Sequence, residues 1–125
     1  MKKPRAKSKA YYRRKCDALL QNIVRLTYTS CIVCGKTNIV GHHYWPKSSA
    51  GVLRYNMKNI VPLCMGCHYK LHLGYPSIQN AINEAKGKEW LDELNALKRQ
   101  FVKCDTISYY KNMVKTLELL MPYRV

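Results

Sequence analysis

The chain has 125 residues, 47% of them apolar, which is the length and composition of one globular domain and excludes wholesale disorder. No apolar run approaches the roughly 18 residues that span a bilayer, so a transmembrane protein is excluded. The 22 Lys and Arg against 7 Asp and Glu give a net charge of +15, and an excess of this size favours a polyanionic partner, most commonly nucleic acid.

The chain begins with a basic segment that leads into a helical pattern. Residues 1–9 predict a flexible basic tail, and residues 10–125 predict a single domain. Apolar residues at three- and four-residue spacing predict a helix over residues 10–29. Residues 31–74 then predict, in order, a tight turn at 31–35, a strand at 39–44, a loop at 46–51, a second strand at 59–63 and a helix from 64 or 65 to 72.

The last part of the chain, residues 76–122, predicts a helical tail. Helices are expected over 77–86 and 89–103, with Gly87 between them, and a final helix is expected after a cap at Asp105 or Thr106. The helix over 89–103 would carry on one face Trp90, Leu91, Leu94, Leu97 and Phe101. The predicted fold class is therefore α+β, with a small strand-containing core flanked by an N-terminal helix and C-terminal helices.

Four of the six cysteines form two CxxC pairs with 29 residues between them: Cys31 with Cys34, and Cys64 with Cys67. The N-terminus lacks the apolar segment of a secretory signal, so we expect a cytoplasmic, reducing location, where such pairs bind metal more often than they form disulfides. Four thiolates complete a closed structural zinc site, and a turn, two strands and a ligand-bearing helix suggest a treble-clef-like finger. The alternative is two redox or incidental pairs. Cys16 and Cys104 stand alone and are expected to be small buried apolar residues.

The four histidines lie within 31 positions: His42, His43, His68 and His72. His68 and His72 are four residues apart, so on a helix they share one face, roughly a quarter-turn from the cysteines of the same helix. His42 and His43 are adjacent, so on a strand they point to opposite sides, and both reach one site only if the chain bends before Pro46. The alternative is that these histidines face DNA or pack in a finger without catalysis.

Residues 31–72 resemble the HNH nuclease family, whose catalytic element is the ββα-metal motif. The likeness rests on the pattern His42-His43-x2-Pro46, then Asn59 opening NIVPLC, then Cys64-x2-Cys67-His68-x3-His72. It implies that His42, His68 and His72 bind one catalytic divalent ion, Mg²⁺, Mn²⁺, Ni²⁺ or Zn²⁺. It also implies that His43 is the general base and that Asn59 constrains the loop carrying it, with Asn56 as a rival for that position.

A wider resemblance is to the phage recombination-associated NinG (Rap) family. It is carried by KCDALLQNIVRL, by the CIVCG turn, by LRYNMKN and by EWLDELNALKRQ. It implies a phage-encoded protein that acts on recombination or branched DNA in the host cytoplasm. The chain departs from that family's pattern at His68, where Asn commonly follows the second CxxC, and this departure strengthens the HNH reading.

These residue types are suited to phosphodiester hydrolysis. A neutral imidazole accepts a proton from water near pH 7, and an ion held by three imidazoles keeps open positions for phosphate and water. Residues 31–75 contain no Asp or Glu, so a mechanism with two metal ions bridged by carboxylates is disfavoured. By the family resemblance, we expect 5′-phosphate and 3′-hydroxyl products.

The basic residues expected to contact DNA surround this core in sequence. The net charge is +8 over residues 1–30, +5 over 31–75 and only +2 over 76–125. Arg54 is the best candidate for a phosphate clamp, because its fork matches phosphate oxygens. The other candidates are Lys47, Lys58, Lys70, Arg13 and Arg14. Each lysine is equally well explained as a solvated charge, and Tyr11 and Tyr12 either stack on bases or pack the helix.

Three functions remain in competition. The leading one is a metal-dependent DNA endonuclease. The second is a zinc finger that binds nucleic acid without catalysis, which is disfavoured because four cysteines already complete a structural finger and leave the histidines unexplained. The third is a recombination factor whose binding to DNA junctions matters more than cutting.

Overall fold

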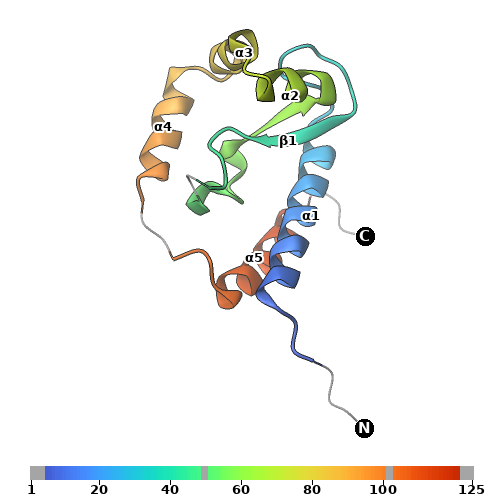
Figure 1. Cartoon of the computed structure of the whole chain (residues 1–125), viewed down its shortest axis with the longest axis vertical. Coiled ribbons are helices and arrows are strands. Elements are labelled where there is room, and N and C mark those ends of the chain that lie inside the picture. The colour runs from blue at the N-terminus through green and yellow to red at the C-terminus, as the bar shows by residue number, and fades with distance from the viewer. Residues whose placement is uncertain (1–4, 49–50, 101–102, 122–125) are drawn as a thin grey trace.

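The computed structural model describes residues 5–48, 51–100 and 103–121 (Figure 1). Over these ranges the elements follow in the order α1 (Lys9–Thr27), β1 (Ile39–His43), the 3-10 helices η1 (Gly51–Leu53) and η2 (Met57–Asn59), β2 (Ile60–Cys64), α2 (Met65–His72), α3 (Pro76–Lys86), α4 (Lys88–Lys98) and α5 (Ile107–Leu120). The fold is thus mostly helical α+β with one antiparallel two-stranded sheet, as the sequence predicts. Nowhere in the described ranges does a helix have the length and apolarity needed to cross a bilayer.

Local capping explains where the outer helices begin. The Ser8 hydroxyl accepts a hydrogen bond from the Tyr11 N–H at 3.1 Å, so α1 begins at Lys9, one residue before the predicted start. Thr106 caps α5 in the same way through the Tyr109 N–H. Of the two caps predicted for the last helix, Thr106 is therefore the one used.

The predicted helix over 89–103 is too long. α4 ends at Lys98, because the N–H groups of Arg99 and Gln100 bond to carbonyls three residues back and tighten the last turn. Phe101, predicted for the apolar face of this helix, lies outside the described residues.

The main core lies between α1, α5 and the sheet. α1 and α5 lie side by side (Figure 1), and α1 also packs on β1. Leu20 and Val24 of α1, Leu117 of α5 and Ile60 of β2 belong to this core and are fully or almost fully buried. This packing fixes α1 as one wall beside β1, the strand that carries the two adjacent histidines.

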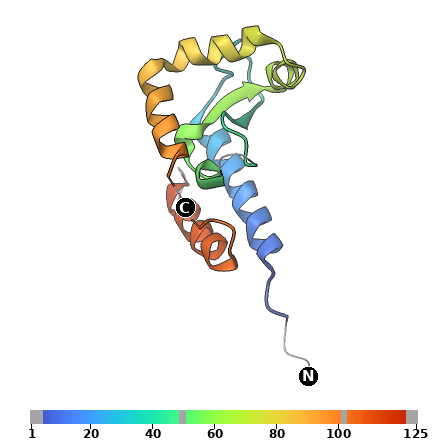
Figure 2. The ribbon, with the colours of Figure 1, turned by 60° about the vertical axis from the view of Figure 1, so that its left-hand side comes forward.

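A second, smaller core anchors the segment that follows β1. α3 packs on α2, and α4 follows it around the outside of the molecule (Figure 2) to reach η1 and η2. There Leu94 of α4 and Leu53 of η1 are both buried against Trp45. The C-terminal helices therefore hold in place the chain segment that follows His43.

Candidate metal sites and the histidine cleft

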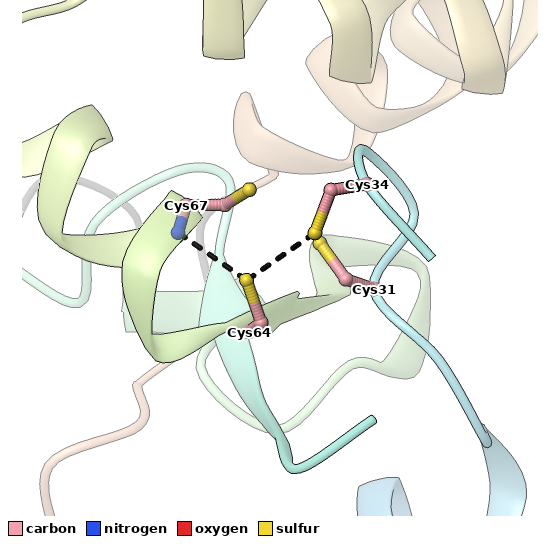
Figure 3. A group of neighbouring side chains, drawn as sticks. All are labelled: Cys31, Cys34, Cys64 and Cys67. Carbon is pink, nitrogen blue, oxygen red and sulfur yellow. Dashed lines mark hydrogen bonds between the residues drawn. The ribbon is translucent and has the colours of Figure 1, made fainter. Parts of the chain in front are cut away.

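The first cysteine pair sits on a tight turn between α1 and β1 (Figure 3). The Cys31 N–H bonds to the Lys36 carbonyl at 2.8 Å, and the Gly35 N–H bonds to the Cys31 carbonyl at 3.0 Å. Gly35 has φ of 77°, a left-handed conformation that favours glycine. The turn therefore presents both sulfurs of the CxxC pair to the same side.

The second pair opens α2. Cys64 is the N-cap of this helix, and its sulfur accepts a hydrogen bond from the Cys67 N–H at 3.4 Å. The sulfurs of Cys34 and Cys64 are 3.5 Å apart, and all four sulfurs lie within 4.8 Å of one another. A tetrahedral zinc site with bonds of about 2.3 Å places its sulfurs roughly 3.8 Å apart, so the four cysteines fit a structural zinc site.

The thiol pKa values differ within this cluster because the backbone favours some thiolates over others. Burial raises the pKa of Cys31, but backbone N–H groups outweigh it and lower that pKa to about 7. The Cys67 N–H lowers the pKa of Cys64. Burial and the three neighbouring sulfurs raise the pKa of Cys67. A cation at the centre would offset this mutual repulsion, which is the electrostatic situation of a metal–thiolate site.

The lone cysteines are elsewhere. Cys16 is fully buried and its thiol donates to the Tyr110 carbonyl at 3.4 Å between α1 and α5, while burial raises its pKa to about 11. The Cys104 sulfur lies close to Gly51. Neither belongs to the cysteine cluster. Cys16 is buried as expected, but Cys104 is only partly buried.

Three histidines converge from two elements. His68 and His72 lie one turn apart on α2, with their Nε2 atoms 3.1 Å apart, and His42 of β1 stands edge-on to both rings. One nitrogen from each ring lies within 4.8 Å of the others, against roughly 3.4 Å expected for tetrahedral nitrogens on a zinc-sized ion. Burial and the neighbouring histidines lower the pKa of His42 to about 4, so its lone pair is available at neutral pH.

His43 is held by a different partner. Its Nε2 lies 2.8 Å from the Arg54 carbonyl oxygen. A carbonyl only accepts, so the ring proton lies on Nε2 and Nδ1 keeps its lone pair. Burial lowers the pKa of His43, although this carbonyl opposes the effect. The ring is thus a neutral base of defined tautomer.

Both adjacent histidines face one cleft of about 670 Å³, which His68 and His72 also line. β1 ends at His43 and the chain bends at Tyr44 and Trp45, as the sequence required if both histidines were to reach one site. The histidine cleft therefore brings together the three converging imidazoles and a fourth, separate one.

Asn59 fastens the segment after the bend. Its side chain is fully buried, accepts from the Trp45 N–H at 2.8 Å, and donates to the carbonyls of Trp45 and Leu53 at 3.0 and 3.3 Å. Asn56 instead caps η2 by accepting from the Lys58 N–H. Of the two candidates, Asn59 is the one that contacts the segment directly after His43.

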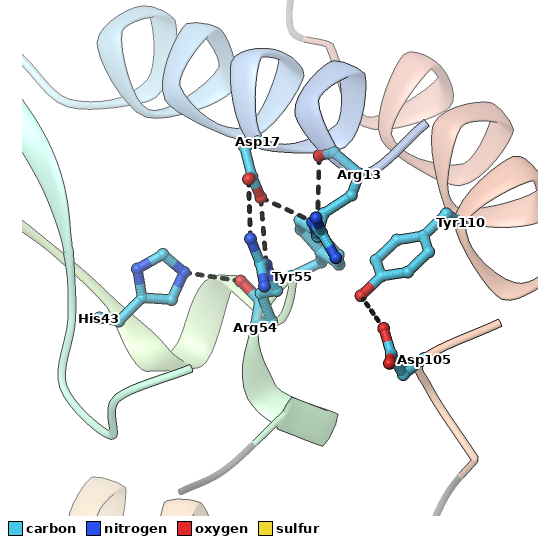
Figure 4. A network of polar contacts seen from close by, with 7 residues as sticks. All are labelled: Arg13, Asp17, His43, Arg54, Tyr55, Asp105 and Tyr110. Atoms are coloured by element: carbon cyan, nitrogen blue, oxygen red, sulfur yellow. Dashed lines mark hydrogen bonds and ion pairs between the residues drawn. The ribbon is translucent and has the colours of Figure 1, made fainter. Parts of the chain in front are cut away.

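The Arg54 side chain forms an ion pair within the chain. Its Nε and Nη2 donate to the two oxygens of Asp17 at 3.1 and 2.8 Å (Figure 4). Arg54 is not among the residues that line the cleft. Burial raises the pKa of Asp17, but hydrogen bonds from Arg54 and Tyr55 outweigh it and hold that pKa below its usual value. The position predicted for a phosphate clamp is thus a bidentate ion pair between α1 and the chain after η1.

The other predicted DNA contacts are spread over the surface. Lys47 lines the cleft. Lys58 pairs with Glu93 at 2.9 Å, and Lys70 is exposed on α2. On α1, Arg13 is half-buried, with its carbonyl 3.4 Å from the Tyr55 hydroxyl, and Arg14 is exposed. Only Lys47 of this set is brought to the histidines.

Sequence reasoning missed two cleft residues on α1. Arg25 lines the cleft and forms no ion pair within the described part of the chain. The Gln21 amide accepts from the Gly41 N–H at 2.8 Å and donates to the Gly41 carbonyl at 3.1 Å, which covers the free edge of β1. A Cβ at Gly41 would lie 2.8 Å from Val24, so this close approach requires glycine. The sequence predicted both α1 and the strand over 39–44, but it gave no sign that α1 packs on that strand.

Comparison with known proteins matches residues 1–118 to the family model of the bacteriophage lambda NinG protein. No curated protein and no solved structure matches the chain. The family match extends from the basic N-terminus through both clusters and nearly all of α5. The chain therefore belongs to the NinG family.

Proposed function

We propose that this protein is a metal-dependent DNA endonuclease of the HNH type, with a structural zinc finger as its core. The observation that carries the proposal is the histidine cleft. There, three imidazole nitrogens converge at ligand spacing, and a fourth imidazole keeps its Nδ1 lone pair because a carbonyl holds its Nε2 proton. A purely structural finger needs neither arrangement, because the four cysteines already form a complete ligand set.

The residues divide the work of hydrolysis. His42, His68 and His72 would hold one divalent ion, and that ion supplies charge stabilisation at the phosphate and at the departing 3′ oxygen. His43 takes the proton of the attacking water on Nδ1. Asn59 positions His43 indirectly, because its hydrogen bonds hold the backbone of the segment that follows β1. The ligand set contains no carboxylate, so the ion keeps its full charge toward an anionic substrate.

Phosphate contacts come from both sides of the cleft. Arg25 reaches it from α1 and Lys47 from the loop after β1. Arg25 takes the role that the sequence suggested for Arg54, since the Arg54 fork is occupied by Asp17. The basic N-terminal third adds electrostatic attraction for DNA of any sequence.

The test is a cleavage assay on supercoiled, linear and branched DNA, with purified protein and with Mg²⁺, Mn²⁺, Ni²⁺ or Zn²⁺ added singly after chelation. We expect cleavage that depends on the ion and is lost in His68→Ala and in His43→Ala. Cys104→Ser is the matched control and should cut as the wild type does. DNA binding without cleavage under every ion would instead assign the protein to non-catalytic nucleic-acid binding or to binding of DNA junctions.

A further inference from the structure

We propose that Asp17 is a positioning residue for His43, acting through Arg54. The proposal rests on the role of His43 in the proposed function. Asp17 lies on α1, far from His43 in sequence, and it is joined to His43 by two consecutive polar links (Figure 4).

The first link is a two-pronged ion pair. Both Asp17 oxygens accept from the Arg54 guanidinium, at 3.1 and 2.8 Å, and Oδ1 also accepts from the Tyr55 hydroxyl at 2.8 Å. The Asp17 and Arg54 side chains are only 32% and 19% exposed. A bidentate, partly shielded pair fixes the Arg54 side chain in direction as well as position.

The second link belongs to the backbone of the same residue. The Arg54 carbonyl accepts from His43 Nε2 at 2.8 Å. Arg54 follows η1 directly, and its N–H bonds to the Gly51 carbonyl at 3.1 Å. The carbonyl that selects the His43 tautomer therefore sits on a short turn, and the Arg54 side chain ties this turn to α1.

Two anchors hold this turn from opposite ends. Asn59 donates to the Leu53 carbonyl from the β2 side, and Asp17 holds Arg54 from the α1 side. Without Asp17, the turn keeps the Asn59 anchor and its own backbone bonds. We therefore expect the fold to be retained and the orientation of the His43 ring to become less well defined.

The experiment compares Asp17→Asn with Asp17→Glu and Arg54→Gln in the full chain. Asp17→Asn should lower kcat by about 10–100-fold, the usual cost of losing an outer partner of a site, with KM and ion affinity unchanged. Asp17→Glu keeps the charge and both oxygens, so its kcat should lie closer to the wild type. Asp105→Asn is the matched control, because it removes a carboxylate that ties α5 to Lys9 of α1 without touching Arg54.

A second readout does not require activity. The ¹⁵N shifts of the His43 ring, measured where the ring is neutral, should show the proton on Nε2 in the wild type and in Asp105→Asn. They should show a mixture of tautomers in Asp17→Asn and in Arg54→Gln. If Asp17→Asn does not fold, Arg54→Gln tests the same link from the other side.

The outcomes separate the two proposals. An unchanged kcat with an unchanged His43 tautomer in both variants overturns the positioning role. A weaker DNA affinity and a salt slope reduced by about 1 in Arg54→Gln also overturn it, because Arg54 then contacts phosphate directly. A wild-type protein that cuts no DNA overturns the proposed function, and the tautomer measurement then decides the positioning role alone.

Discussion

The two ligand clusters share helix α2 and differ in almost every other respect. Cys64 and Cys67 are buried at its start, close to the first CxxC pair, and backbone N–H groups donate to the sulfurs of Cys64 and Cys31. His68 and His72 lie one turn further along and line an open cleft, where His72 is exposed. One short helix thus contributes ligands both to a closed set of four sulfurs and to an open set of imidazoles.

In the proposed function, the cysteine cluster stabilises the fold and the histidine cluster serves catalysis. A closed four-ligand set leaves no position for substrate, so its metal can serve only the fold. Three imidazoles in a cleft leave coordination positions open for substrate, and none of the three is fully buried. Loss of the first cluster should therefore unfold the protein, and loss of the second should leave it folded and inactive.

The largest expected effect tests the closed cluster. Cys31→Ser or Cys64→Ser should unfold the finger, because structural zinc supplies much of the folding free energy of such a domain. Circular dichroism and zinc content per chain measure this, with Cys104→Ser as the control outside the cluster. A Cys64→Ser protein that melts as the wild type does and still binds one zinc would remove the distinction between the clusters.

The next largest effect is expected from substitutions in the histidine cleft. His43→Ala should cut about 10²–10⁴-fold more slowly, which is the usual cost of losing a general base, while ion and DNA affinity stay intact. His42→Ala should also lose cleavage, but through lost ion affinity. Added metal should therefore partly restore cleavage by His42→Ala and should not restore cleavage by His43→Ala. Higher pH should help His43→Ala more, since hydroxide replaces the base.

Calorimetric ion titration beside the cleavage assay decides between these roles. Both variants should melt close to the wild type, in contrast to the cysteine variants. Should His43→Ala lose the ion while His42→Ala keeps it, the two roles are exchanged.

A smaller effect concerns the basic tail. Deleting residues 2–7 removes four basic residues yet spares Ser8, which caps α1, and Lys9, which pairs with Asp105. The log–log salt dependence of DNA binding should flatten by up to about 0.9 for each of the four that meets a phosphate. Zinc content and ion affinity at the histidines should not change. A slope equal to that of the intact chain would show that the tail does not contact DNA.

The smallest effect sharpens the description of the cleft. Arg25→Ala should weaken DNA binding and lower the salt slope by about 1, because one phosphate contact is lost. Arg99→Ala removes the same charge from a residue that does not line the cleft, and it should leave the slope close to the wild type. Equal effects of the two variants would mean that Arg25 acts through net charge alone.

Sequence-based prediction succeeded where one element carries the signal. The CxxC pairs and the four-residue spacing of His68 and His72 are local, so turn and helix geometry predicted each pair. The helices followed from apolar periodicity for the same reason. The grouping of His42 with His68 and His72 was implied by the HNH resemblance, and the three side chains do lie together. The predicted end of α4 was wrong because apolar periodicity continues past the point where the last turn tightens.

Contacts between distant segments were beyond reach. Asp17 and Arg54 are 37 residues apart, and no periodic pattern links an acidic residue on a helix with a basic residue after a loop. Arg54 was therefore predicted to face phosphate. The hydrogen bond between Gln21 and Gly41 was not predicted for the same reason, since 20 positions separate the two residues.

The packing of α1 on α5 has a consequence for the synthesis of the chain. α1 is synthesised about 80 residues before α5, yet Cys16 of α1 bonds to Tyr110 of α5, and Leu20 and Leu117 share one core. Until α5 emerges, the side of α1 that packs on α5 is uncovered, although β1 is already available to the other side; α1 is also the wall that carries Gln21 and Arg25 to the cleft. A nascent chain already contains every cysteine and histidine of both clusters by residue 72 but lacks this wall in its final packing. Synthesis of α5 thus completes the packing of the α1 wall, and a chain stopped short of α5 carries all the ligands beside a wall that is packed on one side only.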